Sequence, residues 1–353
     1  MSKTFYKSLG EKEKWPNITG TNPASLTYDD VLLVPQISRI KSRSSVNISV
    51  KFGPYTLSKP IISAPMDTIT GEKMVRELGR LGAIGTLPRG DLNKRVKLCK
   101  IFSQENIPCL YAVSLKNGLE EAVELSKAGA KMILIDAAHG GMVDSVRKLA
   151  EEIKNKTKLT IVSGNIVTYE QAIMYKKSGI DIARVGVGPG GLCITRMVAG
   201  SGFPQLSAVF ETTSANIPVI ADGGVKKPGD FAKAIAAGAT LVMIGSLFAG
   251  TDEAPGEVID GYKTARGQAS AAYMKDNGVE TGEFRTAEGI SLKVPVKGPV
   301  EYLINDLMGG LRSAMTYAGA ENLVDFQKKA VFCRVSPATL EENIPWLSKM
   351  AIK

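Results

Sequence analysis

The sequence predicts an α/β fold in which eight parallel strands, each followed by a helix, close into a (β/α)8 TIM barrel. Segments with helical spacing and charge, such as VDSVRKLAEEIKNKT, separate short apolar runs rich in valine, isoleucine and alanine. Apolar runs that alternate with amphipathic helices are typical of parallel strands covered by helices. Eight such units favour a closed barrel, and an open doubly wound sheet is the alternative. The runs are PIISAPMD (60–67), AIGTLP (83–88), CLYAVS (109–114), KMILIDAAHG (131–140), LTIVSGN (159–165), IARVGVG (182–188), PVIADGG (218–224) and LVMIGS (241–246).

Three helical segments run into the next strand through similar phrases, SKAGAKMILID, KKSGIDIARVG and AAGATLVMIG. A glycine after the last helical turn adopts the left-handed conformation that ends a helix. We therefore expect Gly129, Gly179 and Gly238 to be helix caps in duplicated βα units.

The chain is expected to form one catalytic domain over residues 1–353, with an N-terminal arm at about 1–59. The arm contains a β-like stretch, VNISVKFGPYTLSKP. Residues 250–298 break the apolar rhythm and are rich in glycine. An insertion after the eighth strand lies at the C-terminal face of a barrel, so this segment is predicted to be an active-site flap. A helix pair is expected beyond it, in PVEYLINDLMGGLRSAMTYAG.

Composition narrows the possible environments and partners. The net charge of +9 suits phosphorylated small molecules, whereas dispersed basic residues and 6% aromatics argue against nucleic-acid binding. No apolar stretch is long enough to span a membrane, and the polar N-terminus does not resemble a secretory signal. Four cysteines, no C-x-x-C pair and a single histidine, His139, argue against a disulfide framework and a zinc site. A cytoplasmic location is expected.

Glycine and polar residues gather where the predicted strands end, which is where barrel enzymes carry their sites. ADGGV (221–225) and IGS (244–246) end strands seven and eight, the usual phosphate site of this fold. Backbone N–H groups free of side chains can converge on a phosphate there. The alternative is that Gly223 and Gly224 only form a tight turn.

The stretch GPGGLCITR (188–196) places Cys193 on a glycine-rich loop beyond a strand. A free cysteine is more often a small buried apolar residue, which suits Cys109 inside an apolar run. Cys193 differs, because a neighbouring cation and oriented N–H groups favour the thiolate. From these residues alone, two interpretations of Cys193 remain: it is a nucleophile, or it is a small buried residue.

The loop GPGGLCITRMVAGSGFPQLSAV (188–209) resembles the catalytic cysteine loop of the IMP dehydrogenase/GMP reductase family. Further stretches resemble that family's signatures in the same order, from about residue 25 to 335; they are SLTYDDVLLVPQ, PIISAPMDTIT, VSGNIVT, IADGGVKKPGD, MIGSLFAG and MGGLRSAMTYAGA. The family fold is a (β/α)8 barrel with a flap, in agreement with the rhythm.

Two features resemble the reductase branch. The chain passes from the second to the third strand without room for the tandem CBS module of most dehydrogenases, and no Arg-Tyr dipeptide, which dehydrogenases use to activate water, is present. GEFRTAEGISLKVPVKG (282–298) resembles the reductase flap. Other positions depart: SAPMD and DAAHGG look like dehydrogenase versions, and Gly191, Gln268 and Ala287 stand where serine, methionine and serine are usual.

The resemblance implies reductive deamination of GMP to IMP and ammonia by NADPH. Cys193 would form a covalent thioimidate with the purine, and Thr195 and Glu288 would protonate the departing ammonia. The substrate-binding residues implied are Ser63, Asp222, Gly223, Gly224, Gly245, Ser246, Arg285 and Gly289. For Arg285 and Glu288 the alternative is a solvated flap whose charges face water.

The same resemblance places the nicotinamide near Asp136, Ala137 and Ala138. It also implies a K+ site at Gly188, Gly190 and Cys193, and a homotetramer that binds purine mononucleotides for purine salvage. The alternative activity is that of a dehydrogenase without CBS domains, which converts IMP to XMP with NAD. A non-catalytic purine-nucleotide sensor is a third hypothesis, against which the retained Cys193, Thr195 and Glu288 argue.

Overall fold

The computed structural model describes residues 4–6, 12–14, 25–137, 139–141, 143–278 and 281–345. Eight parallel strands form one sheet in the order β6-β13-β12-β11-β10-β9-β8-β7. The two outermost strands also meet, through a parallel bridge between Ile62 and Ile84. The predicted barrel is therefore confirmed, and the open sheet is excluded. The strands are β6 (Ile61–Ser63), β7 (Gly85–Leu87), β8 (Cys109–Val113), β9 (Met132–Asp136), β10 (Thr160–Ile166), β11 (Ile182–Val185), β12 (Val219–Asp222) and β13 (Leu241–Ile244).

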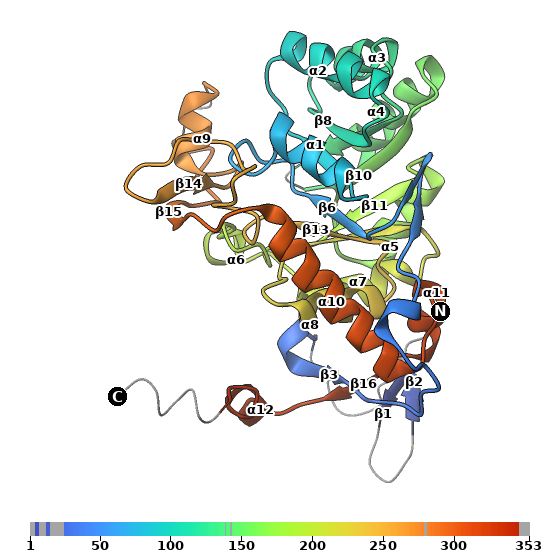
Figure 1. The fold of residues 1–353 in the computed structure, drawn as a ribbon. Coiled ribbons are helices and arrows are strands. Elements are labelled where there is room, and N and C mark those ends of the chain that lie inside the picture. The colour runs from blue at the N-terminus through green and yellow to red at the C-terminus, as the bar shows by residue number, and fades with distance from the viewer. Residues whose placement is uncertain are drawn as a thin grey trace.

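Helices surround the barrel and are joined to the strands by short loops (Figure 1). Gly129, Gly179 and Gly238 have φ values of +101°, +74° and +117°, so the three predicted caps adopt the left-handed conformation. The helices that follow the strands are α1 (Glu72–Arg80), α2 (Leu92–Gln104), α3 (Gly118–Lys127), α4 (Val143–Lys156), α5 (Tyr169–Lys177), α6 (Thr195–Val198), α7 (Gln205–Thr213) and α8 (Pro228–Ala236).

The interior of the barrel is filled with apolar side chains. Phe52 and Leu57, from the hairpin of β4 (Val50–Phe52) and β5 (Tyr55–Leu57), pack into the same cluster as Leu110, Ile182 and Leu241 of the barrel strands. The β-like stretch of the predicted arm is thus part of the core. Because the core is packed, any site must lie on the loops at the strand ends.

A second sheet joins the two ends of the described chain. Its order is β2 (Lys12–Lys14), β1 (Thr4–Tyr6), β16 (Val331–Arg334) and β3 (Val31–Leu33). Helices α10 (Val300–Ala318) and α11 (Leu323–Lys329) precede β16. The prediction of a helix pair within residues 299–319 is wrong, because α10 continues through Gly309 and Gly310 and ends only at Gly319, which has a φ of +66°. Helix α12 (Ala338–Glu342) lies apart from the barrel in Figure 1.

The segment after β13 leaves the barrel and returns to it. The antiparallel strands β14 (Tyr262–Arg266) and β15 (Ser291–Pro295), with α9 (Ala271–Asp276), make up the part coloured orange in Figure 1. We call residues 250–298 the flap. Its two ends pair with each other, since the N–H of Lys297 donates to Gly250 O and the N–H of Asp252 donates to Gly298 O. The two ends of the flap are therefore held together where the flap joins the barrel.

Lys263 holds the base of the flap. Its side chain is buried, and Nζ donates to the carbonyl oxygens of Thr251 at 2.8 Å, Asp252 at 3.3 Å and Ala254 at 2.7 Å. Lys263→Met leaves these carbonyls without their charged donor, and each such bond contributes about 1.5–3 kcal/mol. We expect faster amide hydrogen exchange across the flap and unchanged exchange in the barrel strands. Lys293→Met is the control, because Lys293 is exposed on β15; equal acceleration by both variants would contradict the prediction.

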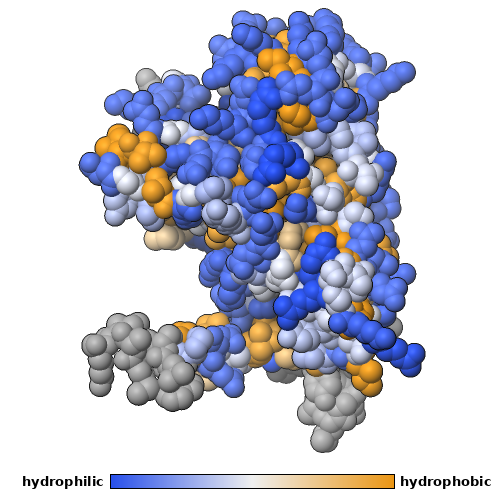
Figure 2. Space-filling model, viewed as in Figure 1, coloured by the Kyte–Doolittle hydropathy of each residue, from blue (hydrophilic) through white to orange (hydrophobic). Residues whose placement is uncertain are grey.

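The surface is mainly polar, with small apolar groups between charged side chains (Figure 2). Several exposed apolar side chains belong to the flap, among them Val258 and Ile259. No helix in the described ranges is both long enough and apolar enough to cross a membrane.

Candidate active site

The cysteine loop follows β11 and ends at α6. Cys193 is partly buried, its N–H donates to Gly190 O, and its Sγ lies 3.2 Å from Oγ1 of Thr195. Arg196 donates to Phe203 O and so braces the end of this loop. The loop thus pairs the thiol with a hydroxyl.

The other cysteines of the chain have different surroundings. Cys99 and Cys109 are buried, and burial raises the pKa of Cys99 and raises that of Cys109 to about 12. A thiol with so high a pKa stays protonated at neutral pH and is a poor nucleophile. Cys333 is partly buried on β16, with Sγ 3.7 Å from Leu32 O, outside the loops of the barrel face. Of the four cysteines, Cys193 is therefore the one that lies on a loop of the barrel face.

Backbone hydrogen bonds join the flap to the cysteine loop. The N–H of Ile194 donates to Glu288 O at 2.9 Å, and the N–H of Ile290 donates to Leu192 O at 3.0 Å. Cys193 and Gly289 consequently form an antiparallel bridge. The structure thus brings Glu288 and Gly289 beside Cys193, across about 95 residues of sequence.

Arg285 lies in a tight turn of the flap. Its N–H donates to Gly282 O, its own carbonyl accepts from the N–H of Gly282, and its side chain is exposed. The contact of Arg285 with a purine base stays a prediction.

Three glycine loops converge beside the cysteine. A Cβ on Gly223 would lie 3.0 Å from Cγ of Pro189, and one on Gly191 would lie 3.0 Å from Oγ of Ser246. Gly223 and Gly224 have φ values of +90° and +83°, so only glycine fits both the conformation and the space. The loops after β11, β12 and β13, the last containing Gly245, therefore meet as the sequence predicted.

Arg184 joins two of the predicted site carboxylates, a link that no sequence pattern indicated. From β11, its Nη1 donates to Oδ1 of Asp136 at 2.8 Å, and its Nε donates to Oδ2 of Asp222 at 2.9 Å. Burial lowers the pKa of Arg184, but the charges of Asp222 and Asp136 and the hydrogen bonds to them outweigh burial and raise it. Asn165 adds a bond from Nδ2 to Oδ2 of Asp222 at 2.8 Å.

This network occupies one oxygen of each carboxylate. Oδ2 of Asp136 is buried and has no hydrogen-bond partner in the described part of the chain, although Nε of Arg89 lies 3.3 Å away. Oδ1 of Asp222 likewise has no hydrogen-bond partner among the described side chains, all partners of this carboxylate being on Oδ2. Ala137 continues from Asp136 and donates its N–H to Gly164 O. Ala138 lies outside the described residues.

Ser63 is not at the site surface. It is fully buried, and its Oγ accepts from the N–H of Thr86 at 3.2 Å and from Oγ1 of Thr70 at 2.8 Å. A ligand could not reach this hydroxyl without displacing both partners. The prediction that Ser63 binds substrate therefore conflicts with its place in the barrel interior.

Gln268 is a further residue of interest on the flap. It lies in a turn closed by a hydrogen bond from the N–H of Ser270 to Gly267 O, and Ala269 O accepts from the N–H groups of both Glu288 and Gly289. The side-chain Nε2 of Gln268 is buried without a hydrogen-bond partner among the residues described. A buried donor without an acceptor costs free energy until a ligand supplies one.

The family model for the IMP dehydrogenase / GMP reductase domain matches residues 25–346. The chain belongs to the IMP dehydrogenase/GMP reductase family. GMP reductase 2 of Mus musculus is 36% identical over 337 residues, which is 89% of this chain and 95% of the relative. Inosine-5'-monophosphate dehydrogenase of Cryptosporidium parvum is 34% identical, over 90% of this chain and 94% of the relative.

A solved structure of the same family has a similar fold. It is a cysteine-to-alanine variant of GMP reductase from Trypanosoma brucei in complex with guanosine 5'-monophosphate, with a TM-score of 0.85 and 27% identity. It covers 92% of this chain, and the chain covers 98% of it. The sequence match and the structural match therefore point to the same family and the same barrel fold.

Proposed function

We propose that this member of the family is a GMP reductase, which uses NADPH to convert GMP to IMP and ammonia. The observation that carries the proposal is the backbone pairing of Glu288 and Gly289 with the cysteine loop, where Thr195 lies 3.2 Å from the thiol of Cys193. A nucleophile, a hydroxyl and a carboxylate residue are thus gathered beside glycine loops suited to a phosphate.

The reaction follows from the roles of these side chains. The thiolate of Cys193 attacks C2 of the purine, and the bond from C2 to the amino group breaks. Thr195 and Glu288 deliver the proton with which ammonia leaves, a general-acid role for a positioned hydroxyl and carboxyl. The thioimidate then accepts a hydride at C2, and the bond from C2 to sulfur breaks to release IMP and the thiolate.

The remaining residues hold the substrate. Asp222 presents Oδ1 to the ribose hydroxyls, since Arg184 and Asn165 occupy Oδ2. Gly223, Gly224 and Ser246 offer backbone N–H groups and a hydroxyl to the phosphate. NADPH, when bound, supplies the hydride. Asp136, whose Oδ2 is paired with Nε of Arg89 at 3.3 Å, is proposed to lie near the nicotinamide of that cofactor.

Further expectations belong to the same proposal. A K+ ion would contact carbonyl oxygens of the loop that contains Gly188, Gly190 and Cys193; within it, Gly190 O already accepts the N–H of Cys193. Apolar side chains exposed on the flap, Val258 and Ile259 among them, suit contacts between subunits of a homotetramer. A cytoplasmic place in purine salvage completes the proposal.

The direct test is to mix the purified protein with GMP and NADPH and to follow reduced nicotinamide and released ammonia together. A paired reaction contains IMP and NAD. We expect one ammonia for each NADPH oxidised with GMP. NADH formed from IMP and NAD, with no reaction of GMP, would identify a dehydrogenase. GMP binding without either reaction would indicate a nucleotide sensor.

The roles proposed for Thr195 and Glu288 predict an effect on kcat that can be measured apart from substrate binding. Thr195→Val and Glu288→Gln remove the proton donors but keep Cys193, and positioned general acids contribute about 10²–10⁴-fold to a rate. We expect kcat for ammonia release to fall about a hundredfold, with the KM for GMP changed much less. Rapid-mixing kinetics check this, because they measure the rate of ammonia release, which is the step that the two substitutions should slow. A loss confined to the KM would contradict the assigned roles.

A further inference from the structure

The phosphate loop after β12, residues 223–225, is braced from outside by an N-terminal segment, residues 26–30. Leu26 exchanges two hydrogen bonds with Ser207 of α7, through its N–H at 2.7 Å and its carbonyl oxygen at 3.1 Å. The next residues form a single 3-10 turn (Tyr28–Asp30) in which Thr27 and Asp30 make a capping box. These hydrogen bonds hold residues 26–30 in place next to the phosphate loop.

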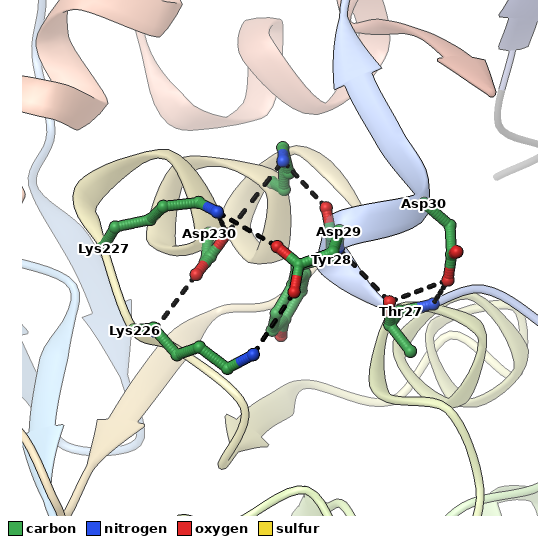
Figure 3. Close-up of polar contacts among 8 residues, drawn as sticks. Thr27, Tyr28, Asp29, Asp30, Lys226, Lys227 and Asp230 are labelled. Atoms are coloured by element: carbon green, nitrogen blue, oxygen red, sulfur yellow. Dashed lines mark hydrogen bonds and ion pairs between the residues drawn. The ribbon is translucent and has the colours of Figure 1, made fainter. Parts of the chain in front are cut away.

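Asp29 connects the segment to the loop, as Figure 3 shows. Its Oδ1 lies 3.0 Å from Nζ of Lys227, and its Oδ2 lies 3.2 Å from Nζ of Lys226. Lys227 lowers the pKa of Asp29, and Asp29 in turn raises the pKa of Lys227. One carboxylate therefore holds both lysines that follow the phosphate loop.

A buried layer lies behind this pair. Oδ2 of Asp230 accepts from the N–H of Lys226 at 3.1 Å, and Nζ of Lys233 donates to Tyr28 O at 2.8 Å (Figure 3 shows Asp230 and Tyr28). Asp230 and Lys233 are 1% and 6% exposed, so water does not compete for these bonds. The lysine backbone is thus held from α8 while the lysine side chains are held from Asp29.

The braced residues adjoin the glycines proposed to bind phosphate. Lys226 is two residues beyond Gly224, and a Cβ at Gly224 would lie 3.4 Å from Cε2 of Tyr28. Nε2 of Gln205 donates to Asp222 O at 3.1 Å, which fixes the other end of the loop. Glycines in the left-handed region have many alternatives in a free chain, so the loop keeps its shape only if its ends are held.

We propose that Asp29 is a positioning residue for the nucleotide phosphate, acting through Lys226 and Lys227 on the backbone of Gly223 and Gly224. The inference rests on the proposed function, because it takes these glycines as the phosphate site. N–H groups fixed in advance bind an anion without the cost of ordering the loop. Asp29 therefore contributes to the affinity for the phosphate and not to the chemical step at C2.

The test compares GMP with guanosine, which lacks the phosphate, in the full-length protein. Asp29→Asn removes the carboxylate charge at nearly constant shape. We expect its KM and dissociation constant for GMP to rise about tenfold, with kcat within about twofold and guanosine binding unchanged. The melting temperature should stay close to wild type, because partly exposed ion pairs add little to global stability. Asp29→Glu, which restores the charge, should recover GMP binding.

Asp325→Asn is the matched control, since Asp325 pairs with Lys329 at 2.8 Å on α11, away from the barrel face. An equal effect of Asp29→Asn and Asp325→Asn, or an equal loss of GMP and guanosine binding, would overturn the assignment to phosphate. A wild-type protein that does not bind GMP would overturn the proposed function and this inference together. Wild-type GMP binding that Asp29→Asn leaves intact would overturn the inference alone.

Discussion

Cys193→Ala is expected to lower GMP-dependent oxidation of NADPH by at least about a thousandfold, since removing a covalent nucleophile leaves only binding and positioning. The thiol lies 3.2 Å from Thr195 and beside the flap residue Gly289, so its loss removes the bond to C2 without disturbing the backbone pairing. We therefore expect GMP to bind the variant with nearly wild-type affinity. Steady-state rates and calorimetric titration with GMP check the two halves of this result.

Cys333→Ala serves as the control, because Cys333 is also partly buried but lies on β16, away from the barrel loops. It should keep the wild-type rate. Mass spectrometry after rapid quenching adds a direct observation: a purine adduct on the wild-type protein that is absent from Cys193→Ala. Residual activity of Cys193→Ala above about a tenth of wild type would contradict covalent catalysis.

Arg184→Met is expected to lower the free energy of unfolding by about 3–5 kcal/mol, the usual cost of leaving buried charges without their partner. Arg184 is 9% exposed and is bonded to both Asp136 and Asp222, which lose this shared partner when the guanidinium is removed. Activity should fall with stability, because the same two carboxylates are proposed to face the cofactor and the ribose. Denaturant titration measures the first effect.

A second variant separates the charge of Arg184 from its full set of contacts. Arg184→Lys, which keeps one charge, should recover part of the loss.

The control is Arg80→Met. Arg80 also contacts two carboxylates, Glu77 at 2.6 Å and Glu301 at 2.8 Å, but its side chain is more than half exposed. Exposed ion pairs contribute little to stability, so this variant should unfold almost like wild type. Equal destabilisation by the two substitutions would mean that burial of the Arg184 network has no special effect.

The fold could be predicted from the sequence because parallel barrel strands are buried on both faces. Burial of both faces produces continuous apolar runs, and each of the eight runs coincides with a barrel strand, although β10 extends one residue beyond its run. The capping glycines could also be predicted, because Gly129, Gly179 and Gly238 occupy a conformation that other residues rarely adopt. These are local properties of the chain, and local properties can be read without coordinates.

From the residues alone, candidate site positions could be proposed where a suitable residue type followed the end of a predicted strand. Gly223, Gly224 and Ser246 met this condition, and so did Cys193. Ser63 met it too, yet its side chain is buried in the barrel, because the strand ends do not reveal the direction in which a hydroxyl points. The resemblance to the family supplied Glu288 and Gly289, whose distance from Cys193 in sequence leaves no local trace.

The sequence by itself determined the order of strands and helices, the glycine loops and the candidate nucleophile, since each depends on neighbours along the chain. Only the tertiary structure decided which charges meet. Arg184 lies in an apolar run, and its partners Asp136 and Asp222 are 48 and 38 residues away. Asp29 and Lys227 are 198 residues apart. Ion pairs depend on distances across the fold, and closing the barrel sets those distances.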